Sequence, residues 1–372
     1  MSKRLRHHKR PVVVVLSIAF AFTTATGALA ATLFDPATDY AAGDSPQRVA
    51  NADFDGDGDR DLAVANFNDD DVSVLLNRGD GTFDPAVDYT VGDEPLAIAA
   101  ANLDRDRRVD LVTANRMDDS ISILSGKGDG TFDEAVDRNV GAGPLAIDTG
   151  RFDGRGRTDI VVANFASDDV SVLLAKGKAG FSRRELAVGD NPRGVAVGDF
   201  DGDDRVDLAV SNDNDDDVTV RFGQDDGSFP ARRDFDAGTG PTPITVGDFN
   251  RDGRDDWAVT NPMDNQVTVR LARAGRKFRN PQSYDVGTNP LYLTAARLDA
   301  GKRVDLAVAN SEDDDVTVLL GNQDGRFTAD TDYAVGDFPI GLAAGELDGA
   351  NGRDLAVANA SDDDVSVLLN AP

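Results

Sequence analysis

The chain has 372 residues, with 67 acidic side chains against 38 basic ones and a formal net charge of −29. It contains no cysteine, and its two histidines are His7 and His8. Beyond His8 the chain has neither histidine nor cysteine. No Ser-His-Asp or Cys-His nucleophile, His/Cys zinc site, His-ligated haem or iron–sulfur cluster can therefore form there. Because so acidic a surface repels nucleic acid and anionic membranes, carboxylate chemistry, hard cations and plain binding are left.

Residues 1–30 have the pattern of a secretory signal peptide. A basic head precedes an apolar run from Val12 to Phe22, and small residues lead up to Ala30. The apolar run is too short to span a bilayer. We therefore expect a cleavable signal peptide, no membrane insertion, and a secreted protein that is extracellular or periplasmic.

Residues 31–372 form a tandem repeat, which predicts a single domain. Seven prolines open equivalent segments that lie 48 or 49 residues apart, and seven phenylalanines recur at the same spacings. The prolines start the repeats at 46, 95, 144, 192, 241, 290 and 339. The phenylalanines are Phe34, Phe83, Phe132, Phe181, Phe229, Phe278 and Phe327.

Each repeat has the pattern of four short strands. A small apolar strand is followed by an acidic loop, the strand DLAVAN, an NDDD-type turn, the strand VSVLL, a Gly-Asp-Gly hairpin and a strand like VDYTVG. No stretch shows a sustained helical period. The second and third strands are apolar on both faces, which is typical of sheets packed on both sides. We predict an all-β seven-bladed β-propeller of four-stranded antiparallel blades.

The last repeat stops after its third strand. The missing strand has a counterpart at the other end, because TLFDPATDYAAGD (32–44) matches TFDPAVDYTVGD (82–93) of the first repeat. Seven hairpin phenylalanines serve seven blades only if Phe34 is counted. We predict that residues 31–45 complete the last blade and close the ring.

The loop between the first and second strands of repeat one reads DxDxDGxxD from Asp53 to Asp61. Oxygen ligands that converge from a tight loop are what calcium requires, and a glycine accommodates the sharp turn. An EF-hand is excluded, because strands flank the loop and the twelfth position lacks its glutamate.

The segment DFDGDGDRDLAVAN resembles the signature of VCBS/FG-GAP repeats, the family that includes the integrin α-subunit propeller. The resemblance covers essentially all of residues 31–372 and implies a seven-bladed propeller with calcium in these loops. We expect about three calcium ions, bound by loops one, four and five. The expected ligands are Asp53, Asp55, Asp57, Asp61, Asp199, Asp201, Asp203, Asp207, Asp248, Asn250, Asp252 and Asp256, with a weaker set at Asn102, Asp104, Asp106 and Asp110.

Two other features of the repeats have structural explanations. Loops three and six have lost ligand positions one and five but keep an aspartate at positions three and nine, so those two aspartates are expected to bind backbone amides. The recurring Asn66-type residue is expected to end a strand in left-handed geometry. The Asp runs after it, such as 69–71, are interpreted as solvated hairpins, with extra cation sites as the alternative.

Arginines gather in the loops of repeats two and three. They replace the lost ion by pairing with Asp153 and Asp159, or they form an anion site for an acidic glycan or a partner's carboxylates. The six residues of this arginine patch are Arg105, Arg107, Arg108, Arg151, Arg155 and Arg157.

The leading hypothesis is a calcium-binding, integrin-like cell-adhesion, binding or scaffold module without catalysis, which acts as a monomer on a protein or glycan ligand. One alternative is a lectin-type propeller with sugars in clefts between blades. Another is a glycan hydrolase that uses paired carboxylates. Against the hydrolase, the acidic residues mostly follow the repeat, whereas an active site breaks repetition at one place.

Overall fold

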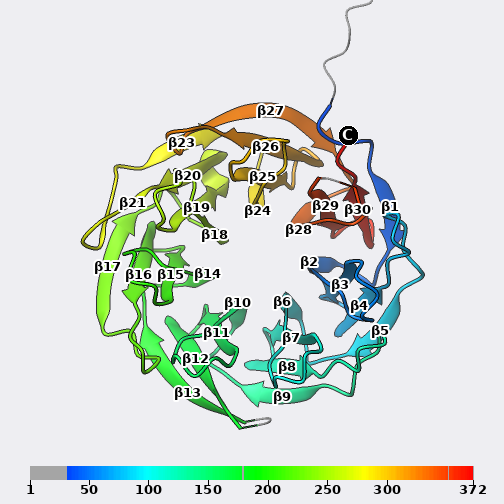
Figure 1. Cartoon of the computed structure of the whole chain (residues 1–372), viewed down its shortest axis with the longest axis horizontal. Coiled ribbons are helices and arrows are strands. Elements are labelled where there is room, and N and C mark those ends of the chain that lie inside the picture. The colour runs from blue at the N-terminus through cyan, green and yellow to red at the C-terminus, as the bar shows by residue number, and fades with distance from the viewer. Residues whose placement is uncertain (1–31, 178–179, 351, 372) are drawn as a thin grey trace, which may run out of the picture. The chain divides into compact units, whose positions relative to one another are not determined.

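Seven four-stranded antiparallel sheets follow one another around a ring, as predicted (Figure 1). The computed structural model describes residues 32–177, 180–350 and 352–371, within the compact unit Thr32–Pro372. The predicted signal peptide lies outside the described residues. No helix in the described part of the chain combines the length and apolarity that a membrane span needs.

Each sheet runs outward from an inner strand. The inner strands are β2 (Pro46–Ala52), β6 (Pro95–Ala101), β10 (Pro144–Gly150), β14 (Pro192–Gly198), β18 (Ile244–Gly247), β24 (Pro290–Ala296) and β28 (Pro339–Gly345). The second strands are β3 (Asp61–Asn66), β7 (Asp110–Asn115), β11 (Asp159–Asn164), β15 (Asp207–Asn212), β19 (Asp256–Asn261), β25 (Asp305–Asn310) and β29 (Asp354–Asn359).

The third strands are β4 (Asp71–Leu75), β8 (Ser120–Leu124), β12 (Asp169–Lys176), β16 (Asp217–Phe222), β20 (Gln266–Arg270), β26 (Asp315–Gly321) and β30 (Asp364–Leu368). The outer strands are β5 (Val87–Thr90), β9 (Val136–Asn139), β13 (Gly180–Ala187), β17 (Ala231–Asp236), β23 (Gln282–Asp285), β27 (Phe327–Ala334) and β1 (Thr38–Ala41). Repeat five alone adds the short pair β21 (Ala272–Arg273) and β22 (Lys277–Phe278) and the 3₁₀ turn η1 (Pro262–Asp264).

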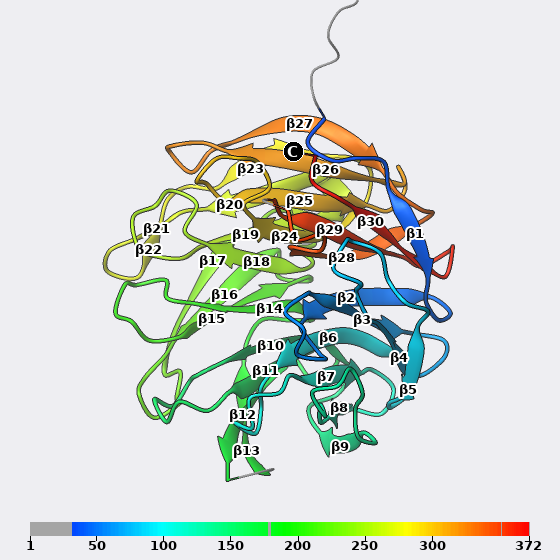
Figure 2. The same cartoon turned by 45° about the vertical axis from the view of Figure 1, so that its right-hand side comes forward.

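The last blade is shared between the two ends of the described chain. Its order is β1-β30-β29-β28, so the N-terminal strand is its outer strand, beside β30 (Figure 2). Phe34 adds a bridge to Asn370 beyond the strand pair, and its ring is buried. The predicted ring closure by the N-terminal strand is therefore confirmed.

The core lies between blades. All six residues of every second strand are buried, which explains why these strands are apolar on both faces. The buried side chains of the described residues fall into seven clusters, each shared by two neighbouring blades. Trp257 is fully buried in one of them. Burial between blades therefore ties the seven sheets into one ring.

The Asp runs are largely exposed, as expected, and they also connect neighbouring blades. Asp70, in the turn between β3 and β4, accepts the backbone N–H of Glu94 at 2.9 Å, just before the inner strand of the next blade. The same contact recurs around the ring and ends where Asp363 accepts the N–H of Ser45 at 3.0 Å. This series of contacts, the inter-blade latches, is a structural role that the sequence did not reveal.

The expectation for Asn66 is wrong in its geometry. Asn66 is the last residue of β3, as expected, but its backbone is not left-handed, and its Nδ2 donates to Asp71 Oδ1 at 2.7 Å and to Ser73 Oγ at 2.9 Å. The left-handed backbone falls on Asp70, at φ 55°. The asparagine therefore joins two adjacent strands through side chains.

Candidate metal centres

The acidic loops are anchored at both ends by buried residues. In repeat one, Phe54 is 3% exposed and meets Phe132 of the next blade edge-on, with ring centroids 5.5 Å apart. Asp61, at the start of β3, accepts the N–H of Phe54 at 2.7 Å with one carboxylate oxygen and that of Asn77 at 2.9 Å with the other. The apolar second position and the aspartate at position nine thus fix the loop to the blade.

Position nine does this in all seven repeats. Each of these aspartates accepts one N–H from its own loop and one from a residue sixteen positions further along the chain. They are Asp61, Asp110, Asp159, Asp207, Asp256, Asp305 and Asp354. The predicted backbone role of position nine is confirmed, including in loops three and six.

The turn itself is also common to loops with and without ligands. Position six has positive φ at Gly58 in loop one (103°), at Gly156 in loop three (67°) and at Asp204 in loop four (62°). Only glycine adopts this backbone without strain. The shape of the loop is therefore the same whether or not the loop gathers carboxylates, and only the residues at the ligand positions differ.

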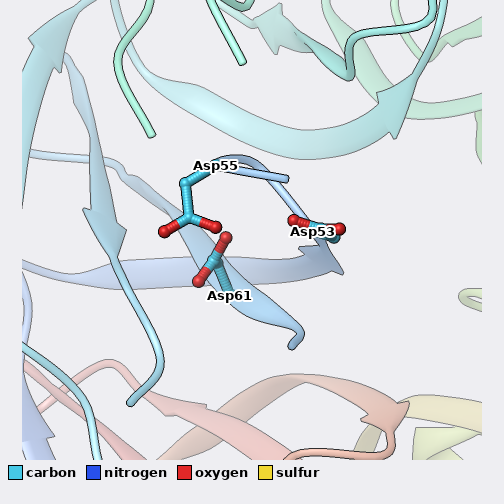
Figure 3. A group of neighbouring side chains, drawn as sticks. All are labelled: Asp53, Asp55 and Asp61. Carbon is cyan, nitrogen blue, oxygen red and sulfur yellow. The ribbon is translucent and has the colours of Figure 1, made fainter. Parts of the chain in front are cut away.

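Loop one brings three carboxylates together. One oxygen each from Asp53, Asp55 and Asp61 lies within 4.8 Å of the other two (Figure 3). Asp55 and Asp61 turn their carboxylates toward one another, and Asp53 lies to one side. Burial, helped by the charges of Asp55 and Asp57, raises the pKa of Asp61 to about 6. Three acids without a cation between them repel one another, and a hard cation would remove that repulsion.

Loop four builds the same arrangement from Asp199, Asp201 and Asp207, again with oxygens within 4.8 Å. Burial, with the charges of Asp201 and Asp199, raises the pKa of Asp207 to about 7. Asp201 Oδ2 accepts a hydrogen bond from Arg276 Nε at 2.7 Å, whereas its Oδ1 is buried without a partner. A buried carboxylate oxygen that no donor satisfies fits a metal ligand.

Loops five and two do not gather their acids in this way. In loop five Asn250 Nδ2 donates to Asp256 Oδ2 at 3.2 Å, and Asp252 pairs with Arg254 at 2.8 Å. Burial, with the charges of Asp252 and Asp248, still raises the pKa of Asp256 to about 8. In loop two, backbone N–H groups of the same loop donate to the side chains of Asn102, Asp104 and Asp106. Burial raises the pKa of Asp110.

Position five does not belong to either three-residue cluster, although burial and the charge of Asp57 beside it raise the pKa of Asp55. Asp57 accepts the N–H of Asp59 at 2.9 Å, and Asp203 forms an ion pair with Arg205. The carboxylates that the structure brings together in loops one and four are therefore those at positions one, three and nine.

Four of the six arginines of the patch bind other residues of the protein. Arg155 pairs with Asp153 at 3.4 Å, and Arg108 pairs with Asp106 at 3.6 Å. Arg105 Nε donates to the carbonyl of Gly156, which shows that loops two and three are neighbours. Arg157 binds the carbonyl of Gly177. Arg107 and Arg151 have no partner among the described residues, so they are the two cations of this patch that could face a ligand.

Several solved propellers share the ring. BBS1N, solved in complex with ARL6DN, is 15% identical, with a TM-score of 0.66 over 91% of this chain and 98% of that one. Virginiamycin B lyase from Staphylococcus aureus is 13% identical, with a TM-score of 0.61 over 91% and 100%. The periplasmic gluconolactonase PpgL from Pseudomonas aeruginosa is 17% identical, with a TM-score of 0.62 over 79% and 86%. At these identities the likeness shows the fold alone.

These neighbours correct one expectation. Because propellers named as a lyase and as lactonases share this ring, the fold gives no ground for excluding catalysis. The prediction that the protein is not an enzyme is therefore wrong: it rested on the regular spacing of the acidic residues, and catalytic groups on a propeller need not follow the repeat.

No curated protein matches the chain. Three overlapping stretches, residues 53–113, 102–162 and 151–210, match the model of the FG-GAP-like repeat. They run from the acidic loop of repeat one to the second strand of repeat four, and the remaining blades repeat the same strand order. This part of the chain therefore consists of FG-GAP-like repeats, within a seven-bladed β-propeller.

Proposed function

We propose that this protein is a secreted, calcium-stabilised propeller that presents its surface to a protein or glycan ligand. The observation that carries the proposal is the pair of carboxylate clusters in loops one and four, each with three oxygens within 4.8 Å. Hard carboxylate oxygens from a short loop are the ligands that calcium takes in proteins. We further propose a third ion in loop five, where Asp252 would leave its ion pair with Arg254 to join Asp248 and Asp256 around the ion.

The bound ions would stiffen the face of the ring that carries the loops. Each loop joins an inner strand to the second strand of the same blade, and its apolar second residue packs on the next blade. An ion held by Asp53, Asp55 and Asp61 would therefore fix the loop at a blade interface. A stiff loop face suits recognition of an extracellular partner, because less conformational entropy is lost on binding.

The test is calcium-dependent stability. At 10 mM calcium and a dissociation constant near 0.1 mM, one site contributes ~2.7 kcal/mol to the free energy of unfolding. We expect a higher melting temperature in calcium than in chelator, little effect of magnesium, and about three ions per chain by titration. Equal melting temperatures in chelator and in 10 mM calcium, at low salt, would refute the proposal.

Position one gives the sharpest variants, because position nine also holds the fold. Asp53→Ala and Asp199→Ala should each remove one ion from the titration. In chelator they lose hydrogen bonds from loop N–H groups but also the repulsion among the acids, so the melting temperature should change little. Arg151→Ala, at position one of loop three, is the matched control and should change neither. Binding to a glycan array with and without calcium would then test the ligand class.

A further inference from the structure

The inner strands leave a cavity at one end of the ring's axis. Its volume is about 450 Å³, within the range of small-molecule sites. Every repeat contributes the residue after its opening proline, so the cavity is encircled by one residue from each blade. These residues are Gln47, Leu96, Leu145, Arg193, Thr242, Leu291 and Ile340. The cavity is distinct from the acidic loops and lined by none of their carboxylates.

Two cations lie on this mostly apolar lining, and they differ. Arg193 is already neutralised, because its Nε donates to Asp213 at 2.6 Å and its guanidinium lies 5.1 Å from the ring centroid of Phe165. Arg48 forms no ion pair with any carboxylate of the described residues. Its Nη1 donates to the carbonyl oxygens of Gln47, at 2.9 Å, and Ile340. Its Nε and Nη2 have no acceptor in the described part of the chain.

Arg48, in the first blade, contacts residues of the sixth and seventh blades. Its guanidinium carbon lies 4.2 Å from the ring centroid of Tyr292, which stands at the same position of repeat six. The intervening blade has Gly341 there, where an added Cβ would come within 2.2 Å of the carbonyl oxygen of Gln47 and 2.9 Å of Arg48 Cα. The glycine thus makes room for Arg48 to reach Tyr292 past the seventh blade.

Arg48 is also poorly solvated for a cation. The surrounding protein lowers the pKa of Arg48 because burial disfavours the charged form. A guanidinium keeps its charge even so, and a half-buried one that lacks a carboxylate is stabilised by any anion that reaches it. Its planar pair of N–H donors matches a carboxylate in particular.

The axis is also where the sevenfold pattern breaks. At the position of Arg48, repeats two, three, four and seven have Ala97, Ala146, Gly194 and Gly341. Two residues further on, where most repeats have alanine or threonine, repeat three has Asp148, which accepts the N–H groups of Thr149 at 2.7 Å and Val197 at 2.9 Å. Burial raises the pKa of Tyr292, and of the nearby charges Arg48 lowers it and Asp148 raises it. Arg48, Tyr292 and Asp148 are therefore the large polar departures from the small residues at these two positions of the inner strands.

We propose that the axial cavity binds a small organic acid, with its carboxylate on the free N–H groups of Arg48 and its apolar body against Leu96, Leu145 and Leu291. Such a ligand satisfies the unpaired guanidinium and fills the apolar part of the cavity at once. Asp148 disfavours a second negative charge deeper on the axis, so monocarboxylates should bind better than dicarboxylates. The site does not depend on calcium in the loops.

The experiment compares carboxylates with their neutral amides. The full chain, in calcium and at 150 mM salt, is titrated calorimetrically with acetate, butyrate, hexanoate and benzoate, and with acetamide, butyramide, hexanamide and benzamide. We expect at least one carboxylate, from the larger members, to bind with a stoichiometry of one and at least tenfold more tightly than its amide. No preference for any carboxylate over its amide would overturn the proposal.

Three variants locate the site. Arg48→Met should weaken the carboxylate at least tenfold and leave the amide within twofold. The melting temperature should fall little, because the lost carbonyl hydrogen bonds and ring contact are offset by removal of a half-buried cation that has no carboxylate partner. Leu145→Phe, which fills the cavity and keeps Arg48, should weaken both probes. Arg116→Met removes an exposed guanidinium that pairs with Glu94 at 2.9 Å, and it should change nothing.

The outcomes separate a binding role of Arg48 from a structural one. If Arg48→Met melts far below the parent and the carboxylate preference survives in the folded variant, Arg48 is a structural brace and the proposal fails. If Arg48→Met does not fold, Arg48→Lys decides: it keeps the charge but loses the planar pair of donors, so an intermediate carboxylate affinity supports the site. Parent-like affinity in both Arg48→Lys and Leu145→Phe would overturn it.

Discussion

Loops three and four of the ring have the same backbone and opposite chemistry. Both have left-handed residues at positions four and six, and both are pinned by a buried aspartate at position nine. Loop four then gathers Asp199, Asp201 and Asp207, whereas loop three places Arg155 against Asp153. Position nine and the turn are thus common to both loops, whereas position one, Arg151 in loop three and Asp199 in loop four, carries the difference in charge between them.

The largest expected effect comes from removing position nine where no ion can bind. Asp159→Ala leaves the buried N–H groups of Phe152 and Ala175 without acceptors, and each such loss costs about 1–3 kcal/mol. We expect the free energy of unfolding to fall by about 2–5 kcal/mol, equally in chelator and in calcium. Denaturant unfolding measures it. A loss that appears only in calcium would mean that position nine is a metal ligand alone.

The next largest effect is expected when loop three receives the acidic residues of loop four. Arg151→Asp combined with Arg155→Asp restores carboxylates at positions one and five on a backbone that already has the required turn. The double variant should be less stable in chelator, because the acids repel one another and the Arg155 pair with Asp153 is lost. At a calcium concentration one hundred times the dissociation constant it should regain ~2.7 kcal/mol and bind one more ion. If the number of calcium ions bound per chain did not change, positions one and five would not be the ones that loop three lacks for binding calcium.

A buried acid outside the loops provides a control for the electrostatic part of the comparison. Burial raises the pKa of Asp148 to about 6, so its protonated form stabilises the fold below the unfolded pKa near 4, and this stability is lost as pH rises through 6. Between pH 4 and pH 7 the free energy of unfolding of Asp148→Asn should therefore rise by about 2 kcal/mol relative to that of the parent. The rise is smaller to the extent that water screens the charge of Asp148. Parallel stability curves in saturating calcium would show that Asp148 is ionised at no cost.

The smallest effect concerns the turn alone. Asp204 occupies the left-handed position six of loop four at φ 62°, where glycine is relaxed. Asp204→Gly should raise the free energy of unfolding by ~1 kcal/mol without changing the number of bound ions. The reciprocal change Gly253→Asp, at φ 82° in loop five, should lower it by a similar amount. Identical stabilities would show that the loops absorb this strain.

The repeat spacing was enough to predict the ring, its seven blades and its closing strand. Position nine could be assigned as well, because Asp159 and Asp305 persist in loops that have no ligand set. These inferences succeed because each depends on a pattern that recurs seven times. Sequence comparison within one chain detects what is shared by the repeats.

Contacts between different repeats could not be predicted, because they leave no pattern that recurs within each repeat. Nothing in the run at 69–71 shows that Asp70 accepts an N–H from the next blade, and the isolated sequence around Arg48 does not point to Tyr292. Arg276 likewise reaches Asp201 from the hairpin of a neighbouring repeat. Only the ring brings these residues together. At the position of Arg48 four of the other six repeats have alanine or glycine, and this departure was a signal in the sequence that could have pointed to the axial cavity.

The inter-blade latches have a consequence for how the chain folds. The seam where Ser45 meets Asp363 joins residues 318 positions apart, whereas the other latches span 23 or 24. Closing so long a segment costs about 5 kcal/mol of chain entropy by the logarithmic scaling of loop closure, so the seam should form after its neighbours. Until then the outer edge of β30 has no partner strand, and this open-ring species is the one most exposed to association with other chains.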